Sequence, residues 1–164
     1  MNPCRTLLQT MLIALAITAA MPALALDIQR DVLLTDDEGG TLSLITSGTI
    51  DVAGGETVTT ARFTDFTALA SRRTVNGEVV RTRSRGVEEV ESVYEGVLDI
   101  AVERDDGEIR NLSIAFEGLT VIRSGDGPQL SGTVIFDGNV VDAADAPARL
   151  LGLVKRSLRF FRLA

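Results

Sequence analysis

The chain contains no histidine and no tryptophan, and it has a single cysteine, Cys4, and a single lysine, Lys155. Histidine is the commonest general base and a frequent ligand of zinc, and thiol catalysis requires a cysteine. Lys155 has no serine three residues before it, so a Ser-x-x-Lys catalytic pair is also missing. These absences exclude most acid–base, thiol and lysine-assisted mechanisms and predict a protein that is not an enzyme.

Acidic residues are the one plentiful group with catalytic potential, and the chain has 23 of them. Paired carboxylates are sufficient for glycoside hydrolysis, so a carboxylate-dependent hydrolase is an alternative. The clusters at residues 36–38 and 105–108 carry oxygen ligands that suit Ca²⁺, but Asp and Gly at these positions are also what tight turns require. We predict turns there, and no metal or cofactor.

Residues 1–25 have the features of a secretory signal peptide. Arg5 precedes an apolar run over residues 7–20, and Ala23-Leu24-Ala25 is a small-x-small cleavage site. An uncleaved anchor is the alternative, because residues 7–26 are long enough to span a bilayer. Cleavage after Ala25 would remove the only cysteine. The sequence therefore predicts a periplasmic or secreted bacterial protein that folds without a disulfide.

From residue 26 to residue 145, short apolar runs alternate with turn clusters at nearly regular spacing. This arrangement is typical of all-β domains. We predict an antiparallel domain of about eight to ten strands, built as a meander, a sandwich or a partly open barrel.

The clearest hairpin covers residues 93–122. Apolar residues alternate on both sides of Asp105-Asp106-Gly107, which suits a three-residue loop closed by a left-handed glycine. This register pairs Ile100 with Leu112 and Leu98 with Ile114, whereas a two-residue turn would place apolar side chains opposite polar ones.

Three further turns are expected. They place Val32 and Leu34 against Leu42 and Leu44, Ile50 against Val58, and a final pair of strands around Asp137-Gly138-Asn139.

Asn76-Gly77 carries the strongest short-range hairpin signal in the chain. A turn there would place Arg72 opposite Arg81, with Arg83 and Arg85 on the same face, and would form a candidate site for an anionic partner. The interpretation that we favour from the sequence is a solvated face whose charges are neutralised by acids of the next strand. These acids are Glu88, Glu89, Glu91 and Glu95.

Residues 146–164 carry five basic residues and no acid, whereas residues 26–145 hold all 23 acids and 10 arginines. Leu151, Val154, Leu158 and Phe161 recur at helical spacing after Pro147, which predicts an amphipathic helix. We expect it to dock on the β domain, because the tether raises its effective concentration there. The alternative is attachment to an anionic membrane surface. The residues expected to contact a membrane or a partner are Arg149, Lys155, Arg156, Arg159, Phe160, Phe161 and Arg162.

Taken together, these patterns predict an exported binding or structural module for an anionic or lipid-like partner, such as a lipid or an anionic component of the cell envelope. An envelope-assembly or membrane-surface protein held by its basic helix is the alternative. Neither a nucleic-acid partner nor a transmembrane span after signal cleavage is expected.

Overall fold

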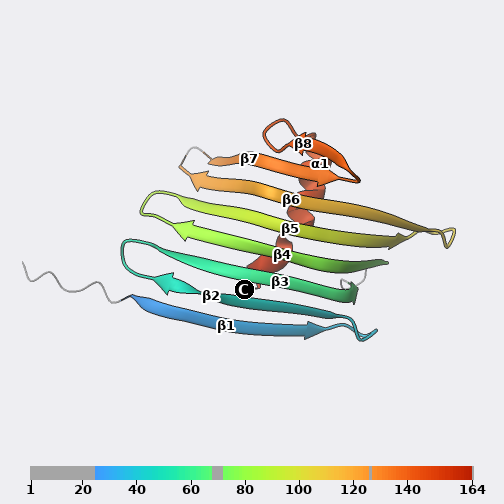
Figure 1. Cartoon of the computed structure of the whole chain (residues 1–164), viewed down its shortest axis with the longest axis horizontal. Coiled ribbons are helices and arrows are strands. Elements are labelled where there is room, and N and C mark those ends of the chain that lie inside the picture. Colours follow the sequence, from blue (N-terminus) through green and yellow to red (C-terminus); the bar gives the residue numbers. More distant parts are fainter. Residues whose placement is uncertain (1–24, 68–71, 126, 164) are drawn as a thin grey trace, which may run out of the picture.

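The computed structural model describes residues 25–67, 72–125 and 127–163. Within them the chain forms one antiparallel sheet of eight strands, and each strand pairs with the next along the chain (Figure 1). The strands are β1 (Leu26–Thr35), β2 (Thr41–Ile50), β3 (Gly55–Thr67), β4 (Arg73–Arg85), β5 (Val90–Glu103), β6 (Ile109–Ser124), β7 (Gly127–Phe136) and β8 (Asn139–Asp142). The helix α1 (Ala148–Ser157) and the 3-10 turn η1 (Arg159–Arg162) follow. The predicted all-β fold with one C-terminal helix is confirmed, as an open meander.

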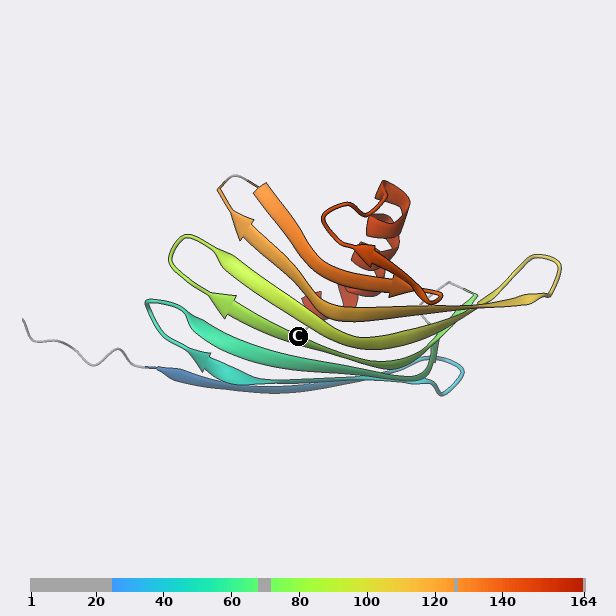
Figure 2. The same cartoon turned by 45° about the horizontal axis from the view of Figure 1, so that its top comes forward.

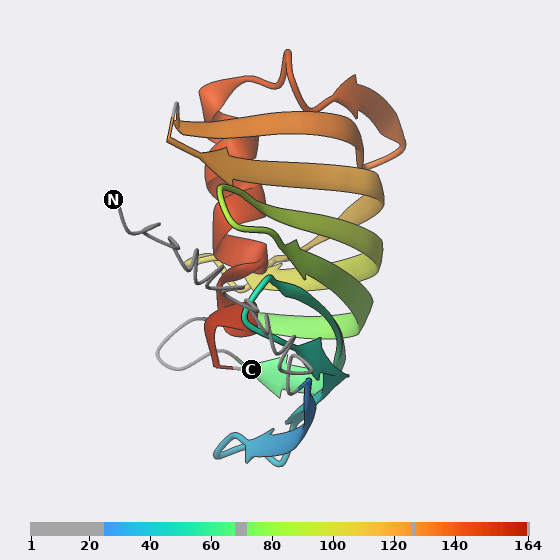
Figure 3. The ribbon, with the colours of Figure 1, turned by 90° about the vertical axis from the view of Figure 1, so that its left-hand side faces the viewer.

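The sheet is strongly curved, and α1 and η1 lie across its concave side (Figures 2 and 3). Alternate residues of each strand point into this concavity, as the two-residue period of a strand requires. The buried core lies between sheet and helix and includes Leu42, Leu44, Leu98, Ile114, Phe116, Leu119 and Val134.

The C-terminal segment contributes to the same core. Val154 and Phe161 are buried in it. The ring of Phe160 lies 5.2 Å from that of Phe63, and the ring of Phe161 lies 5.5 Å from that of Tyr94. These edge-to-face pairs join the end of the chain to β3 and β5. The segment predicted as one helix forms two elements, because the α-helix ends at Ser157 and Phe161 lies in the 3-10 turn η1.

The hairpin between β5 and β6 has the predicted register. Ile100 pairs with Leu112 and Leu98 with Ile114. Gly107 closes the loop at φ 81°, a conformation that costs glycine little. Val32 also pairs with Leu44, as predicted from the first turn.

The predicted turn at Asn76-Gly77 is wrong, because both residues lie inside β4. They face a β-bulge in β3, where Asp65 takes φ 47°. The side chain of Asn76 bonds both the backbone N–H of Asp65, at 2.8 Å, and its carboxylate, at 2.9 Å. Gly77 takes φ 117°, and a Cβ there would collide with the carbonyl oxygen of Val97 on β5. The Asn-Gly pair is thus used for a bulge and a close strand approach.

The register predicted for Ile50 is also wrong. Ile50 pairs with Gly55, and Val58 pairs with Ser47. The loop between Ile50 and Gly55 has four residues, and within it the Asp51 carboxylate accepts hydrogen bonds from the N–H groups of residues 53 and 54. The last turn is shorter than predicted, since Phe136 pairs directly with Asn139.

The predicted signal peptide lies outside the described residues, apart from Ala25. In the part of the chain that is described, no helix has the length and apolar character needed to cross a membrane.

Candidate functional site

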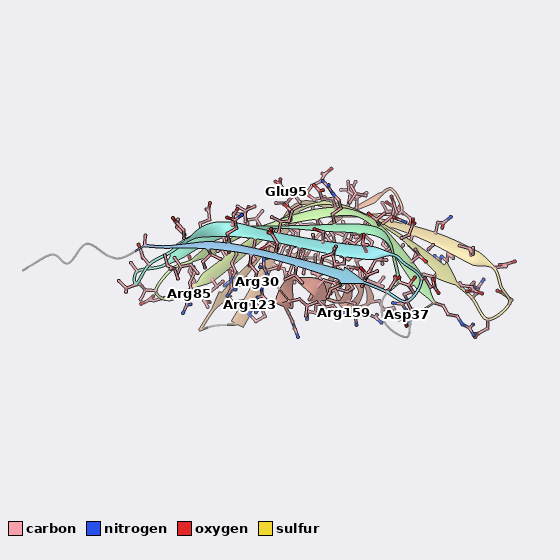
Figure 4. All side chains as sticks on the ribbon, turned by 90° about the horizontal axis from the view of Figure 1, so that it is seen from below. Arg30, Asp37, Arg85, Glu95, Arg123 and Arg159 are labelled. Atoms are coloured by element: carbon pink, nitrogen blue, oxygen red, sulfur yellow. The ribbon has the colours of Figure 1, made fainter. Side chains whose placement is uncertain are left out.

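The two faces of the sheet carry opposite charges. Figure 4 shows Arg30, Arg85 and Arg123 on the side of the helix, and Glu95 on the other side. The strand registers assign every other charged residue at a paired position to one of the two faces. The concave face carries Arg30, Arg73, Arg81, Arg83, Arg85, Arg110 and Arg123. The convex face carries Asp27, Asp31, Glu56, Glu78, Glu91, Glu95, Asp99, Glu103, Glu117 and Asp142, together with Arg62.

Three of the four arginines predicted to share a face do so, because Arg81, Arg83 and Arg85 alternate along β4. Arg72 does not join them. It precedes the strand, and its guanidinium donates to the carboxylate of Asp105 at 2.8 Å. Because β4 continues through residues 76 and 77 without a turn, Arg72 and Arg81 do not lie on paired strands and are not opposite each other.

The expected neutralisation by carboxylates of the next strand is wrong for the acids that stand in β5. Arg81 pairs with Tyr94, Arg83 with Ser92 and Arg85 with Val90. Glu91 and Glu95 have the other parity and face the convex side. Glu88 and Glu89 lie in the loop before β5, and no ion pair joins them to these arginines within the described residues.

Arg81 is the most buried of the concave arginines, with 9% of its surface exposed. Its guanidinium donates to the carbonyl oxygen of Phe161 at 2.9 Å and to the hydroxyl of Thr59 at 3.2 Å, and it lies 5.0 Å from the centre of the Phe161 ring. Its Nε is buried and has no hydrogen-bond partner among the described residues. Burial lowers the pKa of Arg81 below its ordinary value, while Tyr94 opposes this shift. A guanidinium nevertheless stays charged at neutral pH.

A groove lies beside Arg81, between the concave face and the helix, with a cavity volume of about 830 Å³. We call it the large groove. Its apolar floor comes from β5, β6 and β7, and its apolar roof from the helix. The apolar lining residues include Tyr94, Leu119, Val121, Leu130, Val134, Leu151, Val154, Leu158 and Phe161.

The charged groups that line the large groove are all basic. Arg81 and Arg83 come from β4 and Arg123 from β6, and no acid lines the groove within the described residues. The C-terminal segment adds Lys155, Arg159 and Arg162. Of the other tail residues predicted to make contacts, Arg149 and Arg156 are exposed on α1, and Phe160 packs on the core.

Sequence reasoning missed Arg123, which pairs with Val90 and Pro128. Counting alternate residues along β6 from the 105–107 turn would place Arg123 on the convex face. A bulge at Gly118, which takes φ 61°, reverses the parity and returns Arg123 to the concave face. A glycine within an apolar strand was the available signal for this bulge.

The acidic clusters at residues 36–38 and 105–108 lie in turns, as predicted. The Asp36 carboxylate accepts hydrogen bonds from the backbone N–H groups of Glu38, Gly40 and Thr67. The Asp106 carboxylate accepts one from Glu108 at 3.0 Å.

Comparisons with protein-family models, with curated proteins and with solved structures found no match to this chain. The function is therefore inferred from the large groove itself.

Proposed function

We propose that this protein binds an anionic amphiphile, a molecule with one acyl chain and a carboxylate or phosphate headgroup, in the large groove. The observation that carries the proposal is the combination of an apolar floor and roof with a wholly basic set of charged lining residues. The volume of about 830 Å³ is in the range of small-molecule sites, which are largely apolar with a few polar groups that orient the ligand.

The lining residues divide into two roles. Val121, Leu130 and Leu158 are only partly buried and form a surface on which an acyl chain can be buried. Arg83 and Arg123 lie further along β4 and β6, toward the ends of these strands, where a headgroup can remain near solvent. Guanidinium groups bind carboxylates and phosphates through paired, charge-assisted hydrogen bonds. An amphiphile can therefore contact the apolar surface with its chain and the two arginines with its headgroup.

The expected affinity follows from these contacts. A chain of about ten buried methylenes contributes roughly 8 kcal/mol, at about 0.8 kcal/mol each, and a charged hydrogen bond adds about 1.5–3 kcal/mol. Association costs about 4 kcal/mol or more. We expect a dissociation constant on the order of 10 µM.

The packing of the helix favours this function over membrane attachment through the tail. Val154 and Phe161 are buried against the sheet, so a helix that inserted these two side chains into a membrane would first have to leave the core.

Export is also part of the proposal. The N-terminal features predict a mature protein that begins at Leu26 in the periplasm or outside the cell, which intact-mass measurement of the exported protein tests directly.

The test is calorimetric titration with dodecyl phosphate, dodecanoate and the uncharged dodecyl maltoside, each below its critical micelle concentration. We expect the two anions to bind and the maltoside to bind much more weakly. Arg83→Gln should weaken anion binding roughly 10- to 100-fold, because it removes a charge-assisted bond.

Arg62→Gln is the matched control. Arg62 lies on the convex face, where it pairs with Glu78 at 2.6 Å, and its loss should leave binding unchanged. Equal binding of maltoside and dodecyl phosphate, or equal weakening by the two substitutions, would contradict the proposal. Binding to anionic vesicles without binding of monomeric amphiphile would favour the membrane-surface alternative.

A further inference from the structure

A second groove lies on the other side of the C-terminal segment and has a cavity volume of about 390 Å³. We call it the small groove. Its floor is formed by apolar residues of β4, β5 and β6, among them Val75, Ile100 and Leu112, and Leu153 and Phe160 cover it. Ile100 and Leu112 are only partly buried, so apolar surface remains accessible within it.

The small groove repeats the chemistry of the large groove at the opposite ends of the strands. Arg73 pairs with Val102, and Val102 pairs with Arg110, so the two arginines flank one apolar residue across three strands. Neighbouring strands lie about 4.8 Å apart, which places these backbones roughly 10 Å from each other. Two extended guanidinium groups can meet on one acidic headgroup across that span.

The remaining charged lining residues of the small groove are also arginines, and within the described part of the chain no acid is among them. Arg159 lines both grooves and lies 5.2 Å from the centre of the Phe160 ring. Arg73 and Arg110 make no ion pair with any described residue. Like charges gathered beside an open apolar surface repel one another unless an anion joins them.

We infer that the small groove is a second binding site for an acidic amphiphile, separated from the large groove by the helix and sharing Arg159 with it. This inference rests on the ligand chemistry of the proposed function. The smaller volume indicates a shorter or more shallowly buried chain than the large groove accepts. The protein therefore binds two amphiphiles, one on each side of its C-terminal segment.

The test is the stoichiometry of dodecyl phosphate binding to the full-length protein. We expect two equivalents. Leu112→Glu, which places a negative charge on the floor of the small groove, should remove one equivalent, and Leu130→Glu should remove the other. Arg110→Gln should weaken only the small-groove site, roughly tenfold or more, and Arg159→Gln should weaken both sites.

Leu33→Glu is the matched control for the glutamate variants, because Leu33 is 69% exposed on the convex face. It should retain two equivalents, and thermal melts of every variant establish that each is folded. Inorganic phosphate and dodecyl maltoside should each fail to compete, since one lacks the chain and the other the charge.

The outcomes separate the two proposals. A single equivalent that only Leu130→Glu removes would overturn the second site and leave the proposed function intact. A single equivalent that only Leu112→Glu removes would support the small groove and contradict the large one. Absence of binding would overturn both.

Discussion

Replacing Phe161 with alanine should loosen the C-terminal segment from the sheet. Phe161 has 4% of its surface exposed. It lies edge-on to Tyr94 at 5.5 Å and beneath the guanidinium of Arg81 at 5.0 Å. The backbone carbonyl of Phe161 also accepts a hydrogen bond from Arg81. The substitution therefore removes a contact that joins η1 to both β4 and β5.

The magnitude follows from the burial. Truncation of a buried phenylalanine to alanine costs about 3–5 kcal/mol, through lost apolar transfer and the cavity that remains. Domains of this size are stabilised by about 5–15 kcal/mol in total. We therefore expect Phe161→Ala to lower the Tm by roughly 10–15 °C, and to weaken amphiphile binding because Phe161 lines the large groove.

The absence of tryptophan makes this measurement direct. Tyr94 is the only tyrosine in the chain, it is buried, and its ring lies beside Phe161. Near-ultraviolet circular dichroism in the tyrosine band therefore reports on the contact between helix and sheet, while the far-ultraviolet signal reports on the strands. In Phe161→Ala the tyrosine signal should be reduced in the folded state.

Leu163→Ala is the control, because Leu163 is 45% exposed and its truncation should change stability by no more than about 0.5 kcal/mol. A loss below about 1 kcal/mol for Phe161→Ala, with an unchanged tyrosine signal, would refute the view that the C-terminal segment belongs to the core.

Two further predictions concern the sheet. The Asp36 carboxylate accepts backbone hydrogen bonds, that from Thr67 first, which lower its pKa below the ordinary value of 3.8; its stabilisation is present above about pH 4 and is lost as the pH falls through the lowered pKa. Denaturant unfolding of Asp36→Asn should accordingly depend less on pH in the acid range, and an unchanged pH profile would contradict this. Gly77→Ala should cost at least about 2–3 kcal/mol, because φ is 117° and its Cβ would strike the carbonyl of Val97. Gly107→Ala, at φ 81° with open space around it, should cost only about 1–2 kcal/mol, so equal losses in thermal melts would show that the close strand approach is unimportant.

Local patterns predicted the strand register correctly where the turn signal and the alternation of apolar residues on both sides of it required the same pairing. Around residues 105–107 these two requirements agree, and the predicted register of Ile100 with Leu112 is the observed one. At Asn76-Gly77 the turn preference was real but was overridden. The same two residues extend β4 because the strand gains ladders to both β3 and β5, and the Asn76 side chain secures the bulge at Asp65 instead.

The candidate site was predictable only in part for a similar reason. The alternation of Arg81, Arg83 and Arg85 is visible in the sequence, and so is the basic, amphipathic tail. Which side chains stand opposite these arginines depends on register, since a shift of one residue exchanges the two faces of a strand. The bulge at Gly118 produces such a shift, and it brings Arg123 to the concave face.

By itself the sequence determined the all-β class, the amphipathic C-terminal helix and the concentration of basic residues in the tail, because the first two depend on periods of two and of 3.6 residues and the third on composition alone. Only the tertiary structure decided that the arginines share the concave face with the helix, and that one groove remains on each side of the C-terminal segment. The curvature of the sheet and the position of the helix arise from contacts between residues far apart in the chain, such as that between Arg81 and Phe161. No local period encodes such contacts.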